Sequence, residues 1–469
     1  MLRIREPNTG RTAFSSMSSS LTIFWHRRDL RFSDNAGLYR ALKAADAGGS
    51  PVQPIFIFDR EILDKLPTED ARVHFIHQYV TDLAATYREL GSDLWVFYGK
   101  PLEVWKDLID NHGVTAIYTN RDYEPYAIAR DRAVADLVSA AGGTMLDFKD
   151  HVIFESDEVQ KNAGGPYTVF TPYYRKWLSV LDSRMSSVDG EALSFYLKPY
   201  PTERYADGLA QRTEHRDIPS LADMGFEPTD VYIPPTEVSR ELISNYDKTR
   251  NYPSTEGTTR LSVHFRHGTI SIRQKARRAQ GLNDTYLKEL VWRDFYSNIL
   301  QAFPHVVDAP FRPEYQHIPW RNNEEEFKLW CAGKTGVPIV DAGMRQLNES
   351  GWMHNRVRMI TASYLIKHLL IDWRWGEAYF AEKLLDYELA SNNGGWQWAA
   401  GCGTDSQPYF RIFNYDSQQK KFDRGFEYVK EWVPEFDTPE YPAAPIIEHK
   451  TGRERALTVY KTALTRAKN

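Results

Sequence analysis

The hydrophobic pattern of this chain changes character between its first and second halves. From residue 21 to about residue 154, short β-rich runs alternate with stretches of helical period such as residues 75–90. The β-rich runs are residues 22–25, 54–58, 94–98, 116–118 and 145–148. Apolar strands that alternate with helices are typical of a parallel sheet covered on both faces. We therefore expect an α/β domain in the first half.

The second half shows only the helical period. Prolines interrupt the pattern between residues 182 and 239, which indicates a long connector. Beyond Glu241, apolar residues recur at spacings of three and four, as in residues 287–300. The sequence thus predicts an α/β part followed by an all-α part. The expected divisions are a disordered tail at 1–20, a parallel-sheet, Rossmann-like domain at 21–154, a linker at 155–239 and a helical domain at 240–469.

Composition excludes several classes of protein. In 469 residues no apolar run approaches the ~20 residues that span a bilayer, and the first twenty residues lack the apolar region of a secretory signal. Two cysteines, Cys331 and Cys402, are too few for a disulfide framework and fit a reducing cytosol. We expect a cytoplasmic monomer with no membrane partner.

The net charge of -5 argues against a uniformly basic nucleic-acid binder. Residues 260–278 nevertheless carry six Arg and Lys residues and no Asp or Glu. This run predicts either one positive surface on an acidic protein or an ordinary solvated helix face.

Several common catalytic motifs are missing from the sequence. No G-x-G-x-x-G follows the first predicted strand, so a dinucleotide site of the usual kind is not indicated. The chain has neither a P-loop nor a Ser-His-Asp arrangement. His354 lacks a cysteine or second histidine at ligand spacing, so no metal site is predicted.

Tryptophans gather around one polar, glycine-containing turn at residues 392–398. Trp396 and Trp398 lie in this turn, and Trp373 and Trp320 lie upstream of it. A tryptophan most often fills core space, but several near a polar turn also suit stacking on a flat ligand or relaying electrons. We interpret the group as evidence of chemistry on a flat, redox-active molecule.

Residues 351–359 crowd polar and sulfur-containing side chains into two helical turns. On a helix, Asn355, Arg358 and Met359 share one face and Arg356 points elsewhere. Such a face is costly inside a core, so we expect it to line a pocket. The candidates to neutralise a buried Arg358 are Asp386 and Glu388.

Two further segments have open interpretations. Residues 255–262 place hydroxyls and a glycine before a helical pattern, which suits either a phosphate site or an ordinary helix cap. Glu289 and Trp292 share a helix face beside Arg293, as a functional pair or as a partly buried pair without function.

Six segments in a fixed order carry a family resemblance. They are WHRRDLR at 25–31, YTVFTPY at 167–173, GTTRLS at 257–262, ELVWRDFY at 289–296, WMHNR at 352–356 and NNGGWQW at 392–398. From residue 21 to about residue 435 the chain resembles the photolyase/cryptochrome flavoproteins. Within that family, Asn355 and Met359 are similar to class I cyclobutane pyrimidine dimer photolyases. The (6-4) branch has histidine in place of Asn355, and the DASH branch differs around this turn.

The resemblance implies an FAD folded into a U inside the helical domain, with Asn392 facing flavin N5. The implied FAD-binding residues are Tyr246, Thr258, Thr259, Arg260, Leu261, Ser262, Arg293, Arg358, Asp386, Tyr387, Glu388 and Asn392. One position departs from the family pattern: Glu388 stands where aspartate is usual. A hydrogen bond to flavin N3 would then come from a side chain one methylene longer.

The resemblance also implies an activity, the light-driven repair of cyclobutane pyrimidine dimers in UV-damaged DNA. Excited, reduced FAD would pass an electron to the flipped-out lesion, with a protonated Glu289 bonded to the pyrimidine carbonyls. The implied catalytic residues are Glu289, Asn355, Met359, Trp292 and Trp398. The implied photoreduction chain is Trp396, nearest the flavin, then Trp373 and Trp320. The implied DNA contacts are Arg250, Glu289, Trp292, Asn355, Arg356, Trp398 and Arg411.

Two matters stay open in the sequence. Residues 120–126 do not distinguish methenyltetrahydrofolate, 8-hydroxy-5-deazaflavin or FMN as a second, antenna chromophore. The alternative function is a cryptochrome, a blue-light photoreceptor that signals to a protein partner. Such members commonly add a long C-terminal extension, whereas about thirty residues follow Glu435, which favours repair. A flavin scaffold without photochemistry would give the tryptophan chain no reason for its spacing.

Overall fold

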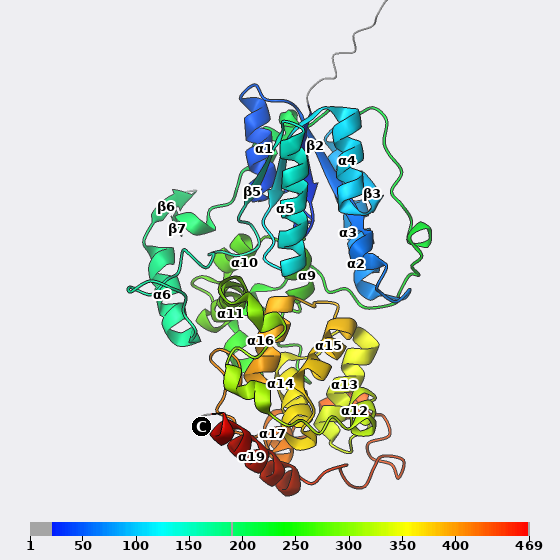
Figure 1. The fold of residues 1–469 in the computed structure, drawn as a ribbon, viewed down its shortest axis with the longest axis vertical. Coiled ribbons are helices and arrows are strands. Elements are labelled where there is room, and N and C mark those ends of the chain that lie inside the picture. The colour runs from blue at the N-terminus through cyan, green and yellow to red at the C-terminus, as the bar shows by residue number, and fades with distance from the viewer. Residues whose placement is uncertain (1–20, 189–190, 468–469) are drawn as a thin grey trace, which may run out of the picture.

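The computed structural model describes residues 21–188 and 191–467. The predicted tail at residues 1–20 lies outside these described residues. A sheet with its covering helices forms one end of the elongated molecule, and a helical assembly forms the other (Figure 1). This arrangement confirms the predicted α/β part followed by an all-helical part.

A five-stranded parallel sheet in the order β3-β2-β1-β4-β5 forms the first part. Its strands are β1 (Leu21–His26), β2 (Val52–Asp59), β3 (Trp95–Gly99), β4 (Val114–Asn120) and β5 (Thr144–Phe148). In the register, Phe24 of β1 lies between Pro54 and Tyr118. The five strands match the five predicted β-rich runs, and the inner strands β1 and β2 are buried along their whole length.

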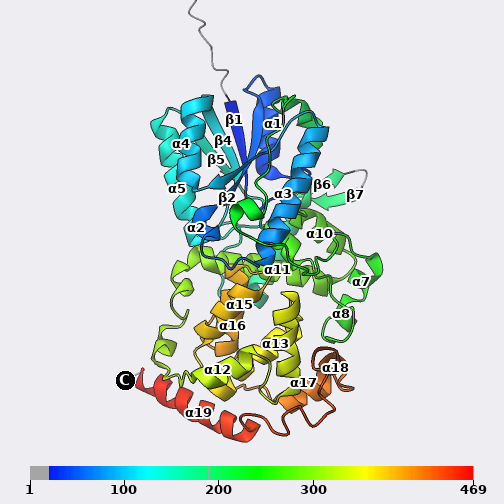
Figure 2. The ribbon, with the colours of Figure 1, turned by 90° about the vertical axis from the view of Figure 1, so that its right-hand side faces the viewer.

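The helices of this part cover both faces of the sheet. They are α1 (Ala36–Asp46), α2 (Arg60–Leu63), α3 (Ala71–Glu89), α4 (Pro101–His112) and α5 (Pro125–Ala140). Helices α1 and α3 lie on one face and α4 and α5 on the other (Figure 2). Successive residues of β1 point to opposite faces, so Phe24 packs in the core under α1 and α3 while Trp25 packs under α4 and α5.

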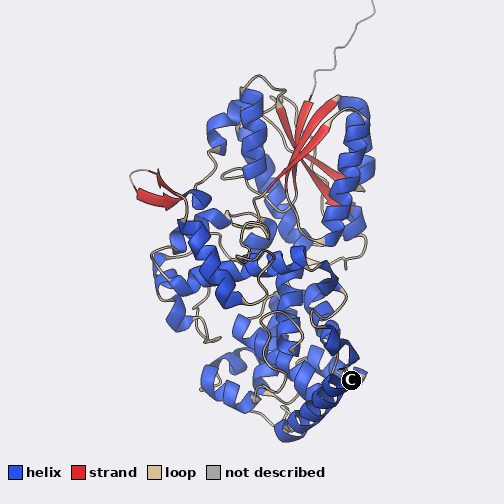
Figure 3. Cartoon of the chain, turned by 60° about the vertical axis from the view of Figure 1, so that its left-hand side comes forward, coloured by secondary structure: helices blue, strands red, loops and turns tan. Residues whose placement is uncertain are grey.

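A long segment of short elements connects the two parts. These elements are α6 (Phe170–Asp182), β6 (Met185–Val188), β7 (Glu191–Ser194), η1 (Phe195–Leu197), η2 (Thr202–Gly208) and η3 (Ala222–Met224). Strands β6 and β7 form an antiparallel hairpin, red at the left of Figure 3, which the sequence pattern did not predict. Farther along, the chain returns to the sheet, where the Ala210 N–H donates to the Val52 carbonyl at 2.8 Å.

The second part is built from helices, and in the described residues from 240 to 467 the regular structure is helical only. Its first elements are α7 (Arg240–Ser244), α8 (Tyr246–Thr249), α9 (Ser262–His267), α10 (Ile272–Ala279), α11 (Asp284–Ala302), η4 (Pro304–Val307), η5 (Pro313–His317) and α12 (Glu324–Cys331). The remaining elements are α13 (Pro338–Ser350), α14 (Asn355–Ser363), the π-helical turn η6 (Tyr364–Leu369), α15 (Trp373–Lys383), α16 (Leu389–Ala400), α17 (Tyr415–Phe422), α18 (Glu427–Trp432) and α19 (His449–Arg466).

The basic run at residues 260–278 does not form the predicted positive surface or solvated face. Arg273 and Lys275 are almost completely buried. Arg273 forms ion pairs with Asp34 at 3.0 Å and Asp150 at 2.8 Å, both in the α/β part. Lys275 binds Glu237 of the connector at 3.2 Å. Arg273 therefore joins the helical part to the α/β part, and Lys275 joins it to the connector.

The end of α9 approaches the loop after β1 closely. Gly268 has φ +62°, and a Cβ atom there would lie 2.1 Å from the Arg28 carbonyl oxygen. The Leu30 N–H donates to the His267 carbonyl at 3.1 Å beside it. Only glycine fits this position, because both its backbone conformation and the nearby main chain exclude a side chain.

No helix within the described ranges is both long and apolar enough to cross a membrane.

Candidate functional site

A cavity of about 430 Å³ lies among helices α11, α14, α15 and α16. Figure 1 shows these four helices close together in the second part. This volume falls within the range of small-molecule sites. The predicted site residues in its lining are Arg250, Glu289, Trp292, Arg293, Asn355, Arg356, Arg358, Met359, Asp386, Tyr387, Glu388, Asn392, Trp396 and Trp398. Side chains far apart in the sequence therefore meet around one space.

The other predicted residues lie outside this lining. They are Tyr246, Thr258, Thr259, Arg260, Leu261, Ser262, Trp373, Trp320 and Arg411. Tyr246 adjoins the cavity, because the Arg250 guanidinium lies 5.4 Å from its ring centroid. Helix α9 begins at Ser262, directly after the predicted phosphate turn. The phosphate role of that turn stays a prediction.

Helix α11 directs Glu289 and Trp292 into the cavity from neighbouring turns. The helix starts at a strong cap, since the Asn283 side chain accepts two backbone hydrogen bonds. Behind the cavity, the Trp292 indole stacks on Phe170 of α6, with ring centroids 3.6 Å apart and planes inclined by 4°. One face of Trp292 is thus held by Phe170, which fixes the ring in the cavity wall.

Glu289 and Arg250 form an ion pair in the cavity wall. Both side chains are partly buried. The sequence predicted that Glu289 contacts the lesion and that Arg250 contacts a DNA phosphate. In the structure these two residues bind each other instead.

Helix α14 begins beside the cavity with a histidine cap. His354 Nδ1 accepts a hydrogen bond from the Arg356 N–H at 3.1 Å. Burial lowers the pKa of His354 to about 4, and the charges of Arg356 and Arg358 act in the same direction. The ring is therefore neutral near pH 7. Arg356, expected to point away from the Asn355 face, also lines the cavity and contacts the Met359 sulfur at 3.6 Å.

Asp386 is the partner of Arg358. Two hydrogen bonds of 2.9 and 3.1 Å join the Arg358 guanidinium to the Asp386 carboxylate, which is almost fully buried. The Asn392 amide donates to the carboxylate and carbonyl of Glu377, at 3.1 and 3.0 Å. Three polar groups of the cavity wall thus have fixed orientations.

Glu388, the other candidate partner of Arg358, has different contacts. Its Oε1 accepts a hydrogen bond from Arg28 at 2.8 Å and lies 2.7 Å from His151 Nε2. Burial opposes ionisation, but Arg293, His151 and Arg28 together hold the pKa of Glu388 well below its usual range. Burial and the two arginines lower the pKa of His151 to about 3. A carboxylate of the cavity wall is thereby bound to the α/β part.

The three tryptophans of the predicted relay belong to one core. Trp396 is buried and lines the cavity. Trp373 is buried in the same core outside the cavity lining, and Trp320 is partly exposed. Trp396 also contacts Trp330 edge to face, with centroids 6.1 Å apart. Trp320 contacts Tyr460 at 5.9 Å. The relay itself stays a prediction.

The cavity fits a flat cofactor that carries phosphates. Trp292, Trp396 and Trp398 offer aromatic surfaces, and arginines supply positive charge. His354 Nε2, Arg356 Nε and, in the predicted phosphate turn, Arg260 Nε are buried polar atoms without a hydrogen-bond partner. Such atoms suit a ligand that supplies the missing partners.

The strand-end residues predicted to adjoin an antenna are engaged with their neighbours. Asn120 donates to Asp29 at 2.6 Å and to Asn35 at 2.8 Å. The nearby cavity lined by Arg28, Asp122 and His151 measures about 10 Å³, space for about one water molecule. The identity of a second chromophore therefore stays open.

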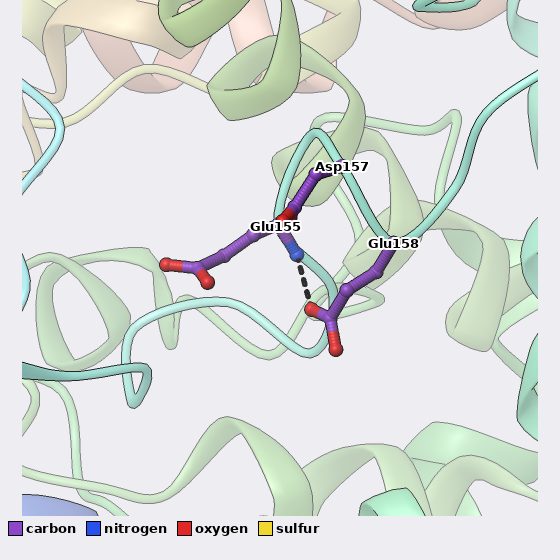
Figure 4. Close-up of side chains that lie close together, drawn as sticks. All are labelled: Glu155, Asp157 and Glu158. Carbon is purple, nitrogen blue, oxygen red and sulfur yellow. Dashed lines mark hydrogen bonds between the residues drawn. The ribbon is translucent and has the colours of Figure 1, made fainter. Parts of the chain in front are cut away.

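Glu155, Asp157 and Glu158 bring their carboxylates within 4.8 Å of one another (Figure 4). Glu155 already binds Arg121 at 2.6 Å, and Glu158 binds Lys149 and the backbone N–H of Glu155. Protein cations and donors thus bind oxygens of Glu155 and Glu158, and a partly exposed acidic cluster of this kind does not by itself indicate a metal site.

Sequence reasoning missed three residues that shape the cavity wall. Phe170 and Arg28 lie within quoted motifs, YTVFTPY and WHRRDLR, but their roles depend on contacts with distant segments. His151 lies in no quoted motif and gave no local signal. The one available clue to Arg28 and His151 was that a carboxylate buried at Glu388 needs partners of opposite charge or hydrogen-bond donors.

Known protein families match both parts of the chain. The family described as "DNA photolyase" matches residues 22–191, and the family described as "FAD binding domain of DNA photolyase" matches residues 286–440. A protein of Halobacterium salinarum named deoxyribodipyrimidine photo-lyase is 37% identical, covering 94% of this chain and 99% of its own length.

Two solved structures share the whole fold. A class III photolyase from Agrobacterium tumefaciens has a TM-score of 0.80 and 32% identity, covering 96% of this chain and 99% of its own. An archaeal photolyase from Sulfolobus tokodaii, described with two FAD molecules, has a TM-score of 0.77 and 32% identity, covering 94% of this chain and 100% of its own. The similarity therefore extends over both parts of the chain.

Proposed function

Because this chain belongs to the photolyase/cryptochrome family and carries its FAD-binding domain, we propose that it repairs cyclobutane pyrimidine dimers in DNA with light. The single observation that carries the proposal is that one cavity is lined both by the proposed lesion contacts and by the proposed flavin contacts. The proposed lesion contacts Glu289, Asn355, Met359, Trp292 and Trp398 line the same space as the proposed flavin contacts Arg358, Asp386 and Asn392.

FAD, when bound, supplies a one-electron transfer that light drives and that is reversed after the dimer has split. Arg358, fixed by Asp386, and Asn392, fixed by Glu377, would orient the flavin ring. Arg293, Tyr387 and Glu388 would complete the wall. The residues that would hold the diphosphate and sugar are Tyr246, Thr258, Thr259, Arg260, Leu261 and Ser262.

Two aromatic side chains would hold the flipped lesion. Extruding a nucleotide from a duplex costs least where the base is damaged. Trp292 and Trp398 would repay that cost by stacking, which contributes ~1–3 kcal/mol per base. Phe170 keeps the Trp292 ring in place before the lesion arrives, so little ordering remains to be done on binding.

Glu289 and Asn355 would stabilise negative charge that develops on the pyrimidine carbonyls. Glu289 can donate a hydrogen bond only as a protonated acid, and in the structure it is paired with Arg250. Repair by this route therefore includes a partner exchange, in which Arg250 turns from Glu289 to a DNA phosphate and Glu289 takes up a proton from water as the lesion enters.

Positive charge near the cavity would grip DNA. Arg250 and Arg356 line the cavity, and Arg411 is exposed in the loop before α17. The protein carries a net charge of -5, so attraction to phosphate has to come from such a local group. Trp396, Trp373 and Trp320 would return electrons to the flavin from the surface.

The proposal is tested by illuminating the reduced protein with an oligonucleotide that contains one thymine dimer. Recovery of thymine absorbance is followed in light and in darkness. We expect recovery only in light and only with reduced FAD. Equal recovery in darkness, or none in light, would contradict repair and leave the photoreceptor alternative standing.

A further inference from the structure

Glu388 lies where the cavity meets the α/β part. It precedes α16 as its N-cap residue and lines the cavity, with a side chain that is 12% exposed. Its Oε2 accepts a hydrogen bond from the Ser391 hydroxyl at 3.0 Å. Its Oε1 faces the other way, toward Arg28 after β1 and His151 after β5, at 2.8 and 2.7 Å.

The length of the glutamate side chain makes these contacts possible. The photolyase/cryptochrome resemblance places aspartate at this position, one methylene shorter. Removing one carbon withdraws the carboxylate by about 1.5 Å. A hydrogen bond of 2.7–2.8 Å lengthened by that amount is lost. Arg28 and His151 are therefore within reach of Glu388 and beyond the reach of an aspartate on the same backbone.

The surrounding charges form a closed set across the joint between the two parts. Arg28 also binds Asp122 at 3.0 Å and Glu124 at 3.1 Å, and Glu124 binds Arg266 at 2.7 Å. Since His151 is neutral, three arginines balance three carboxylates. The members are Arg28, Asp122 and Glu124 from the α/β part and Arg266, Arg293 and Glu388 from the helical part.

This set is balanced only while the two parts stay together. The α/β members sum to one negative charge and the helical members to one positive charge. Removing Glu388 or Arg28 leaves the buried set with one more charge of one sign than of the other, which is costly. Arg28 itself has little freedom, because its carbonyl abuts Gly268 and its Nε donates to the Arg266 carbonyl at 3.2 Å.

We propose that Glu388 is a positioning residue whose carboxylate is held in the FAD cavity by Arg28 and His151, so that the α/β part completes the flavin site. The inference rests on the FAD site of the proposed function and not on dimer repair. It assigns to Arg28, outside the FAD-binding domain, a part in flavin retention and in flavin redox potential.

The first test uses the side-chain length. Glu388→Asp restores the residue usual in the family, yet we expect FAD to leave the heated protein roughly tenfold faster, the scale of coupling between contacting residues. Arg28→Gln should have the same effect, and the double variant should be no worse than either alone. Retention in Glu388→Asp equal to that of the unchanged protein, or effects that simply add, overturns the proposal.

The second test uses the sign of a redox shift, which loosened packing does not explain. Reduction adds electron density to the flavin, so loss of a nearby negative charge eases it and loss of a nearby positive charge hinders it. Glu388→Gln is expected to raise the midpoint potential of bound FAD, and Arg28→Gln to lower it. Shifts in the same direction, or no shift, contradict the proposal.

Arg28→Lys and Arg345→Gln complete the design. Lysine keeps the charge at position 28, so Arg28→Lys should recover most of the potential and part of the retention. Arg345 forms an ion pair with Glu435 at 2.6 Å, and neither residue lines the cavity. Arg345→Gln should therefore lower thermal stability without changing the flavin midpoint potential. A comparable potential shift in Arg345→Gln overturns the assignment. These measurements need no DNA, so they stand apart from any failure of repair.

Discussion

The indole of Trp292 lies flat against the phenyl ring of Phe170, with centroids 3.6 Å apart. Phe170 belongs to α6 and Trp292 to α11, so the stack joins the connector to the helical part. Because Trp292 also lines the cavity, its free surface is presented there in a fixed orientation.

Replacing Trp292 with alanine should weaken binding to dimer-containing DNA and leave binding to undamaged DNA unchanged. Stacking recognises the flipped base and not the backbone. We expect a loss of about 1–3 kcal/mol for the damaged duplex only. Titration of both duplexes measures it. Phe170→Leu, which removes the stack but leaves the indole, should cost less. Equal loss for both duplexes would count against the lesion contact.

Replacing Arg411 with alanine should have the opposite pattern. Loss of one phosphate contact lowers the slope of log K against log salt by about 0.7–0.9 and weakens damaged and undamaged duplex alike. Titrations at several salt concentrations give the slope. Lys328→Ala, an exposed cation on α12 outside the cavity, serves as the control. An unchanged slope in Arg411→Ala would remove this residue from the DNA contacts.

Replacing Trp396 with phenylalanine should stop photoreduction of oxidised FAD. Phenylalanine keeps most of the packing but is much harder to oxidise than tryptophan. Flavin absorbance under illumination with an external reductant follows the reaction. Repair by chemically reduced protein should persist. The control variant Trp105→Phe, which changes a buried residue of α4 in the α/β part, should photoreduce its FAD at the original rate. Photoreduction at the original rate in Trp396→Phe would refute the relay.

Replacing Asn355 with histidine should impair dimer repair without creating (6-4) repair, since that reaction needs further changes in the pocket. Asn355 is exposed at the start of α14, so the thermal midpoint should change little. Repair yields on the two lesions are measured separately. Undiminished dimer repair would show that Asn355 does not contact the lesion.

Replacing Lys367 with methionine should stabilise the protein, more at low pH than at high pH. Burial lowers the pKa of Lys367 from 10.5 to about 7. Between these values the unfolded chain binds more protons, so this lysine makes stability rise with pH from about 7 to 10. We expect a gain of about 1–3 kcal/mol near pH 6 that shrinks by pH 9.

Lys367 Nζ donates to the Ala400 carbonyl at 2.9 Å. Methionine preserves the volume at position 367 but cannot donate, and the Ala400 carbonyl then keeps the Tyr460 hydroxyl as its donor, at 3.2 Å. Thermal unfolding of both proteins at about pH 6, 7.5 and 9, which span the titration of Lys367, measures the gain at each pH. Lys328→Met, at an exposed lysine, is the control. A gain that does not depend on pH would contradict the charge argument.

Sequence patterns predicted the architecture because the elements are locally encoded. The inner strands β1 and β2 are largely apolar runs, and helices such as α3 follow their own period. The hairpin β6–β7 escaped prediction because its strands have four residues each and no alternating pattern to distinguish them from the connector.

The cavity lining was largely predictable because it follows short motifs on α11, α14 and α16. Its outer support was not, because contacts such as Glu388 with Arg28 join residues 360 positions apart. Helical spacing also misplaced Arg356. Its long side chain turns to the Met359 sulfur and the Phe422 ring, which α-carbon directions alone do not reveal.

At Gly268 the main chain of the helical part touches the main chain of the sheet part, with room for no side chain between them. With the two main chains in direct contact, the two parts cannot slide past each other. The buried Arg273 of the helical part is also paired with Asp150 of the sheet part. The two parts should consequently melt in a single calorimetric transition. They also cannot be exchanged freely between relatives, since a chimera would contain only one of the two surfaces that pack together here.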